Sequence, residues 1–153
     1  MSDTKTKAQL LQACIQDLYA ARQVAMERMP CVIGEAGPEL AARLDDLRTS
    51  YAEQAEQFEG TDISLDGPEN IWMAGVMDDA ERDTRSIAHG VLLDTALIGA
   101  LRKGVAADSV SLETAIEVAR SLGREDVAEL TQRMRERSGD HDGRLRALLQ
   151  EIA

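Results

Sequence analysis

Apolar residues recur at alternating steps of three and four along most of the chain, and this helical periodicity constrains the fold more than any other feature. The first periodic segment begins near Asp3 or Thr4, and Gly34 and Gly37 end it. The second opens with Pro38 in its first turn, and Gly60 is its expected C-cap. The later segments are expected at 68–86, 91–122 and 125–151. The sequence therefore predicts four long helices and one short one.

No stretch of useful length alternates apolar and polar residues as a strand would. Long amphipathic helices with short connections pack antiparallel around a shared core. Apolar residues make up 44% of the 153 residues, which is enough for one core, and aromatics only 3%, so leucine and alanine must fill it. We expect residues 1–153 to form a single all-α domain, an antiparallel four-helix bundle with an extra short helix between the second and third long helices.

The net charge of −11 argues against nucleic acid or an anionic membrane surface as a partner, because both are recognised by clustered lysine and arginine. No apolar stretch approaches the roughly 20 residues of a membrane span. No signal-peptide pattern opens the chain, so a cytoplasmic location is expected. Cys14 and Cys31 lack zinc-site spacing and are predicted to be buried, reduced thiols.

Each long apolar stripe is interrupted near its middle by a polar residue. The interruptions are Arg22, Gln54, Asp108 and His141, with Ser50 and Ser138 nearby. Arginine stays protonated and offers no lone pair, so it is a poor metal ligand. One hypothesis is that Arg22 and Asp108 form a buried ion pair and that Gln54 and His141 complete its hydrogen bonds. The alternative is that Arg22 extends to solvent along its stem and Asp108 lies on an exposed face.

A metal site is a second interpretation of the same polar residues. Its candidate ligands are Asp17, Asp108, Glu136, His141 and Asp142, which would hold iron or manganese. It requires the helix faces to be shifted and Arg22 to point away from the centre. Because neighbouring helical residues point about 100° apart, an intact helix cannot converge His141 and the aspartates beside it on one ion.

The short helix carries an apolar group that is a candidate protein interface, formed by Ile71, Trp72, Met73 and Val76. Alternatively, Trp72 covers the core of the bundle. No nucleophile motif and no glycine-rich phosphate loop occurs, so the sequence favours a non-enzyme.

The order of several short stretches resembles the bacterial YciF/YciE-type ferritin-like family (DUF892). The stretches are Asp-Leu-Tyr-Ala-Ala at 17–21, Met-Pro at 29–30, Asp-Thr-Ala-Leu-Ile at 94–98, Glu-Thr at 113–114, Ala-Arg-Ser-Leu-Gly at 119–123 and Asp-Val-Ala-Glu-Leu at 126–130. The resemblance implies a ferritin-like bundle, often a dimer, with inward acids and histidines. Arg22 stands where that family usually has an acid. Glu136 and Asp142 are the acids that best match its last helix.

These observations together predict a metal-free, non-catalytic ferritin-like bundle with no cofactor. We expect it to be a homodimer with a structural, binding or stress-associated role, with an unidentified protein as a further candidate partner. The alternative function is a dinuclear iron or manganese oxidoreductase, or a metal-binding protein with a shifted ligand set.

Overall fold

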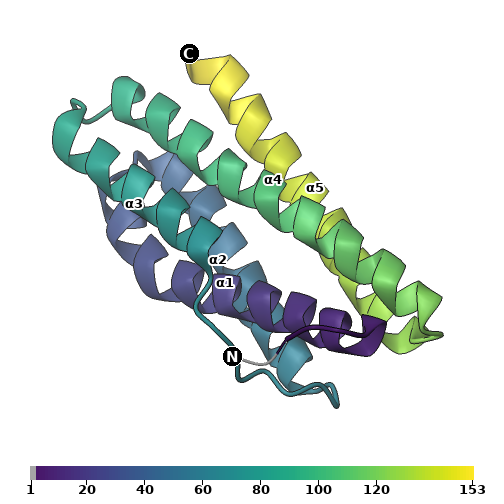
Figure 1. Cartoon of the computed structure of the whole chain (residues 1–153). Coiled ribbons are helices and arrows are strands. Elements are labelled where there is room, and N and C mark those ends of the chain that lie inside the picture. Colours follow the sequence, from purple (N-terminus) through teal and green to yellow (C-terminus); the bar gives the residue numbers. More distant parts are fainter. Residues whose placement is uncertain (1–2) are drawn as a thin grey trace.

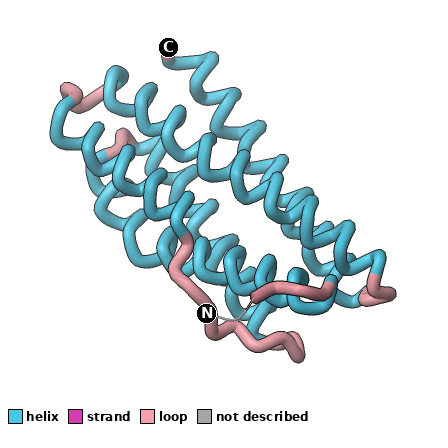
Figure 2. Tube along the Cα trace, viewed as in Figure 1, coloured by secondary structure: helices cyan, strands magenta, loops and turns pink. Residues whose placement is uncertain are grey.

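Caps set the helix boundaries in the computed structural model, which describes residues 3–153. The first helix begins at Lys7 because the Thr6 hydroxyl accepts from the Gln9 backbone N–H while the Gln9 side chain accepts from the Thr6 N–H. The prediction of Asp3 or Thr4 as the cap is therefore wrong by two or more positions. The helices are α1 Lys7–Glu35, α2 Pro38–Glu59, α3 Ile71–Ser86, α4 Val91–Ser121 and α5 Glu125–Ile152. Residues 3–153 contain no strand (Figure 2), which confirms the all-α prediction.

The four long helices form a bundle in which α1 and α2 are one antiparallel pair and α4 and α5 are the other (Figure 1). The pairs meet where α1 contacts α4 and α2 contacts α5. This is the ferritin-like antiparallel bundle that the sequence predicted. The connection from α2 to α4 contains α3, which packs against both α1 and α4. It lies lengthwise along them and does not cross the bundle or its end.

Two features hold α3 in this position. Its polar second half meets Arg28 of α1, which pairs with Asp78 and Glu81 at 2.7 and 2.8 Å. The hydrogen bonds from Arg28 hold the pKa of Glu81 below its ordinary value. Its apolar half lies over Gly104 of α4, where an added Cβ would stand 3.2 Å from Val76 Cγ1. Gly104 therefore allows a close helix approach, and α4 continues unbroken through it.

The predicted apolar stripes are buried almost throughout, and they form two clusters along the bundle axis. One cluster contains Ala25, Tyr51, Val105 and Leu145, and the other contains Leu18, Phe58, Leu112 and Met134. Leu122 is the clear exception: it is 37% exposed at the end of α4. Cys14 is half-buried and Cys31 exposed, so the prediction of two buried thiols is wrong.

No helix within the described residues combines the length and the apolar character that crossing a membrane requires.

Candidate functional site: a buried polar layer

A layer of polar side chains separates the two apolar clusters at the middle of the bundle. On α1, Arg22 follows Leu18 of one cluster and precedes Ala25 of the other. Gln54 and Asp108 occupy the same level on α2 and α4, and Ser138 and His141 do so on α5. All of these side chains are buried. The layer is therefore contributed by all four long helices.

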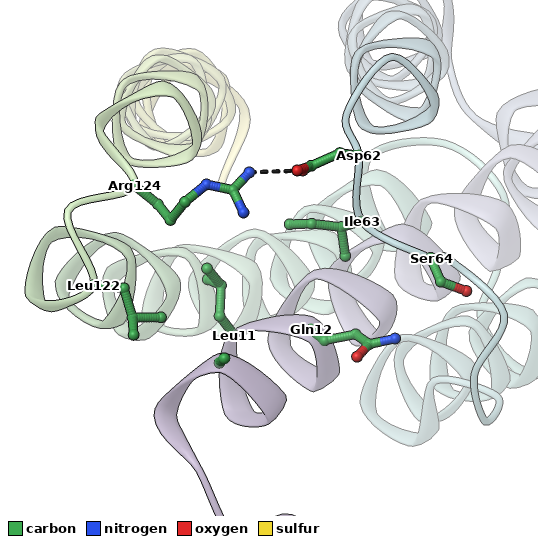
Figure 3. A pocket seen from close by; sticks show the side chains of 8 residues that line it. Leu11, Gln12, Asp62, Ile63, Ser64, Leu122 and Arg124 are labelled. Atoms are coloured by element: carbon green, nitrogen blue, oxygen red, sulfur yellow. Dashed lines mark hydrogen bonds and ion pairs between the residues drawn. The ribbon is translucent and has the colours of Figure 1, made fainter.

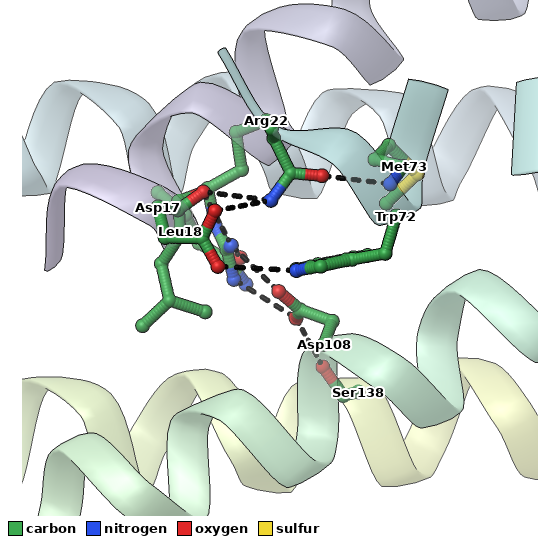
Figure 4. A network of polar contacts seen from close by, with 9 residues as sticks. Asp17, Leu18, Arg22, Trp72, Met73, Asp108 and Ser138 are labelled. Atoms are coloured by element: carbon green, nitrogen blue, oxygen red, sulfur yellow. Dashed lines mark hydrogen bonds and ion pairs between the residues drawn. The ribbon is translucent and has the colours of Figure 1, made fainter. Parts of the chain in front are cut away.

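The centre of the layer is an ion pair between Arg22 and Asp108, both 0% exposed. Nη1 of Arg22 donates to Oδ1 of Asp108 at 2.8 Å, and Nη2 donates to Oδ2 at 3.0 Å. This two-bond geometry is the strongest arrangement open to a guanidinium and a carboxylate. The structure thus places the guanidinium inside the bundle and not in solvent (Figure 4).

Two further N–H groups of the guanidinium have acceptors, and two aromatic rings lie close to it. Nε of Arg22 donates to Oε1 of Gln54 at 3.0 Å, and Nη1 donates to the Leu18 carbonyl at 3.0 Å. The guanidinium carbon lies 5.3 Å from the ring centroid of Tyr51 and 5.4 Å from that of Phe58. Aromatic faces attract a cation, more so where water is excluded. A buried charge is costly unless it is paired and hydrogen-bonded, and Arg22 meets both conditions.

Asp108 has a second partner residue, and it is not the one that the sequence hypothesis named. Ser138 of α5 donates to Oδ2 of Asp108 at 3.3 Å, and His141 does not contact the ion pair. Nε2 of His141 instead lies 2.9 Å from the Ser50 hydroxyl, which also accepts from Nη2 of Arg137 at 3.0 Å. The layer therefore has two parts: a central ion pair, and a serine–histidine contact between α2 and α5.

The surroundings of His141 favour the neutral form of its ring. Burial lowers the pKa of His141, and the positive charges of Arg137 and Arg144 lower it further, against smaller opposing effects of Asp46 and Asp140. Burial also raises the pKa of Tyr51, and the charge of Asp108 adds to this effect. Neither group therefore adds a charge to the layer at neutral pH.

Sequence reasoning missed a second polar network, which joins α1 to the start of α3 (Figure 4). Asn70 caps α3 by accepting from the Met73 backbone N–H at 2.7 Å. Its side-chain amide donates to Oδ1 of Asp17 at 2.8 Å, and Trp72 Nε1 donates to Oδ2 at 3.1 Å. The asparagine directly before an apolar run was the available signal, because asparagine is a preferred N-cap.

This network decides the position of the four residues predicted as an interface. Trp72 is half-buried and bonded to Asp17, and Met73 is buried in the core. Val76 packs against the core cluster, while Ile71 is 86% exposed. Of the four, only Ile71 is freely exposed, so the group does not form a continuous apolar surface.

The structure does not bring the five alternative metal ligands together. Asp17 serves Asn70 and Trp72, both oxygens of Asp108 are bonded to Arg22, and Asp142 pairs with Arg102 at 2.7 Å. Glu136 is exposed. Within residues 3–153, no three histidine, cysteine or acidic side chains are grouped so that they could hold a metal ion. The donors therefore do not fit a dinuclear iron or manganese centre, and a guanidinium occupies the middle of the layer.

A separate open pocket of about 460 Å³ lies at the end of the bundle where α1 begins. Leu11, Ile63 and Leu122 line it, and Arg124 closes one side through an ion pair with Asp62 at 2.6 Å (Figure 3). Its lining is mixed, and it lies away from the polar layer.

Comparison with known proteins agrees with this architecture. A family model described as a domain of unknown function (DUF892) matches residues 6–153. The crystal structure of the E. coli stress protein YciF is similar at a TM-score of 0.92 and 19% identity, covering 97% of this chain and 98% of that one. YcfI from Rhodopseudomonas palustris, for which a structural role has been suggested, is similar at a TM-score of 0.86 and 20% identity, covering 94% and 95%. No protein with a curated description matches.

Proposed function

The chain belongs to the DUF892 family, and from this premise we propose that it is a ferritin-like bundle that acts through a structural or binding role and not through a metal centre. In this proposal, the buried ion pair occupies the place where metal-binding bundles gather their ligands. The protein would work in the cytoplasm, in a stress-associated setting.

The single observation that carries the proposal is the position of Arg22. Ferritin-like metal sites need inward carboxylates and histidines from several helices. Arg22 instead brings a permanent positive charge to that level, 0% exposed, and uses both oxygens of Asp108. A cation placed there would lose the carboxylate to Arg22 and would be repelled by the guanidinium.

The stress-associated part of the proposal comes from likeness alone. YciF is described as a stress protein, and a structural role has been suggested for YcfI. Both are about one-fifth identical to this chain, so they support the fold directly and the role only as a proposal. The family resemblance likewise supports a homodimer, which sedimentation equilibrium of the purified protein would test.

Metal content is the decisive measurement. The protein would be expressed in medium supplemented with iron and manganese, desalted, and analysed for bound metal per chain. A second sample would be incubated with Fe²⁺ or Mn²⁺ and melted, because a ligand that binds only the folded state raises the melting temperature.

We expect almost no retained metal and no metal-dependent shift in a protein that melts cooperatively. One or two metal ions per chain would overturn the proposal. In that case, Asp108→Asn and Asp142→Asn would be compared to locate the ligands.

A further inference from the structure

A small pocket between α2 and α5 reaches the polar layer from the surface. Its volume is about 200 Å³, and its lining includes Ser50 and Gln54 of α2 with Arg133 and Arg137 of α5. The floor is formed by buried side chains, since Ser50 is 2% exposed and Gln54 is 6% exposed. The pocket is smaller than the roughly 300 Å³ at which sites for drug-sized ligands begin. It suits a small polar group.

Gln54 presents a donor to this pocket. Nε of Arg22 can only donate, so the Gln54 atom 3.0 Å from it must be the amide oxygen. The amide nitrogen is then left as a donor, and it has no hydrogen-bond partner within residues 3–153. Every fully enclosed side-chain nitrogen and oxygen in these residues does have a partner. The Gln54 amide nitrogen is therefore reachable from the pocket.

The two arginines of the pocket bring positive charge to this face of an acidic chain. Acids outnumber lysine and arginine by 28 to 17, yet neither Arg133 nor Arg137 pairs with a carboxylate within the described residues. Arg137 donates only to the Ser50 hydroxyl, at 3.0 Å. Two other arginines of this helix do pair with acids, Arg135 with Glu113 and Arg144 with Asp46, whereas Arg146 has no carboxylate partner within the described residues either.

The spacing of the two arginines places their charges close together on α5. Arg133 and Arg137 stand four residues apart on α5, which places them on one face. Like charges at this spacing repel, and within residues 3–153 no carboxylate is bonded to both, although Glu53 lines the same pocket. Met134 between them is buried, whereas both arginines are exposed. An anion between the guanidinium groups would remove the repulsion.

We propose that this pocket binds a small oxyanion, and specifically a phosphate group. Arg133 and Arg137 would donate hydrogen bonds to its oxygens from the α5 side. The Gln54 amide nitrogen would donate another from the floor of the pocket. Guanidinium groups match the oxygens of phosphate in geometry and charge. The Ser50 hydroxyl, also bonded to His141, holds Arg137 in place. Glu53 lines the rim and opposes the anion, which sets a limit to its affinity.

The test measures binding of inorganic phosphate by titration calorimetry at constant ionic strength, on protein treated with a chelator. We expect saturable binding, and a loss of affinity of about tenfold or more for Arg133→Ala and for Arg137→Ala, as removal of a charge-assisted hydrogen bond predicts. Arg137→Lys keeps the charge without the fork, and it should also weaken binding. This variant covers the case in which Arg137→Ala does not fold. Glu53→Gln should strengthen binding.

Arg146→Ala is the matched control. Arg146 is exposed on the same helix, nine residues beyond Arg137, which places it about 180° around the axis. It removes the same charge and should change the affinity less than about twofold. Absence of saturable phosphate binding, or an equal loss in Arg146→Ala, would overturn the proposal. Acetate that competes as well as phosphate would overturn the assignment to a phosphate group.

This inference rests on the proposed binding role, but the two fail separately. Metal retained by the untreated protein would refute the metal-free bundle. Phosphate binding is measured on chelator-treated protein, so its result would stand independently. A protein that retains no metal and does not bind phosphate would refute only the oxyanion site.

Discussion

Asp108→Ala gives the sharpest test of the polar layer. The change removes both carboxylate acceptors of the Arg22 guanidinium, which is 0% exposed and cannot reach water without opening the bundle. Breaking a buried ion pair by removing one partner costs about 3–5 kcal/mol. For a domain of this size each kcal/mol lowers the melting temperature by about 2–4 °C, so a fall of roughly 6–20 °C is expected. Thermal melts followed by circular dichroism would measure it.

Two further variants separate the ion pair from any general effect of losing an acid. Asp142→Ala removes a carboxylate that pairs with Arg102 while about one-third exposed, and exposed pairs contribute only about 0–1 kcal/mol. The double variant Arg22→Met, Asp108→Leu removes both charges, and it should recover much of the loss because neither charge is stranded. Recovery stays incomplete, since Gln54 and Ser138 lose partners. If the Asp108→Ala and Asp142→Ala variants had the same melting temperature, the buried ion pair would be refuted.

Three other changes follow from the structure. His141 has a lowered pKa in the folded state, so its neutral form contributes stability that is present above the unfolded pKa of about 6.5 and is lost as pH falls below it. His141→Gln should flatten this part of the stability–pH curve in urea titrations, and a curve unchanged by the substitution would contradict the effect of burial on this ring. Gly139→Ala in the middle of α5 meets no neighbouring atom within 4 Å and should stabilise by about 0.5–1 kcal/mol in chemical denaturation. A lower stability there would contradict the open space at this position. Trp72→Phe loses the hydrogen bond to Asp17 and should destabilise by about 1.5–3 kcal/mol, and an unchanged denaturation midpoint would show that this bond does not anchor α3.

If the pocket binds phosphate as proposed, the middle of the bundle contains two different polar sites: a buried ion pair and a pocket open to solvent. The Arg22–Asp108 pair is closed to solvent and satisfied internally. The Arg133–Arg137 side is open, and neither arginine pairs with a carboxylate within the part of the chain that the structure describes. Gln54 links them, because its oxygen serves Arg22 and its nitrogen faces the pocket. Binding could therefore be altered by substitutions in the core that never touch the ligand.

The sequence by itself determined the class of fold. The apolar stripes of the long helices follow the helical period, and Pro38 and Gly60 bound the second helix as local backbone chemistry requires. It also indicated the level of the polar layer, because polar residues interrupt each stripe near its middle. Helix starts were less certain, since Asp3, Thr4 and Thr6 are all capable caps and only the capping box with Gln9 selects Thr6.

Tertiary structure alone decided which polar side chains meet. Arg22 and Asp108 are 86 residues apart, and no local pattern states that their helices face each other at that height. The partner of His141 depends on the rotation of α5 against α2, which brings Ser50 to it and Ser138 to Asp108. Asp17 accepts a hydrogen bond from Trp72 because α3 lies along α1. Gly104 allows the close approach of α3, and the ion pairs of Arg28 hold α3 there. Period and caps are properties of a single helix, whereas a hydrogen bond across the bundle depends on how helices are rotated and shifted against one another.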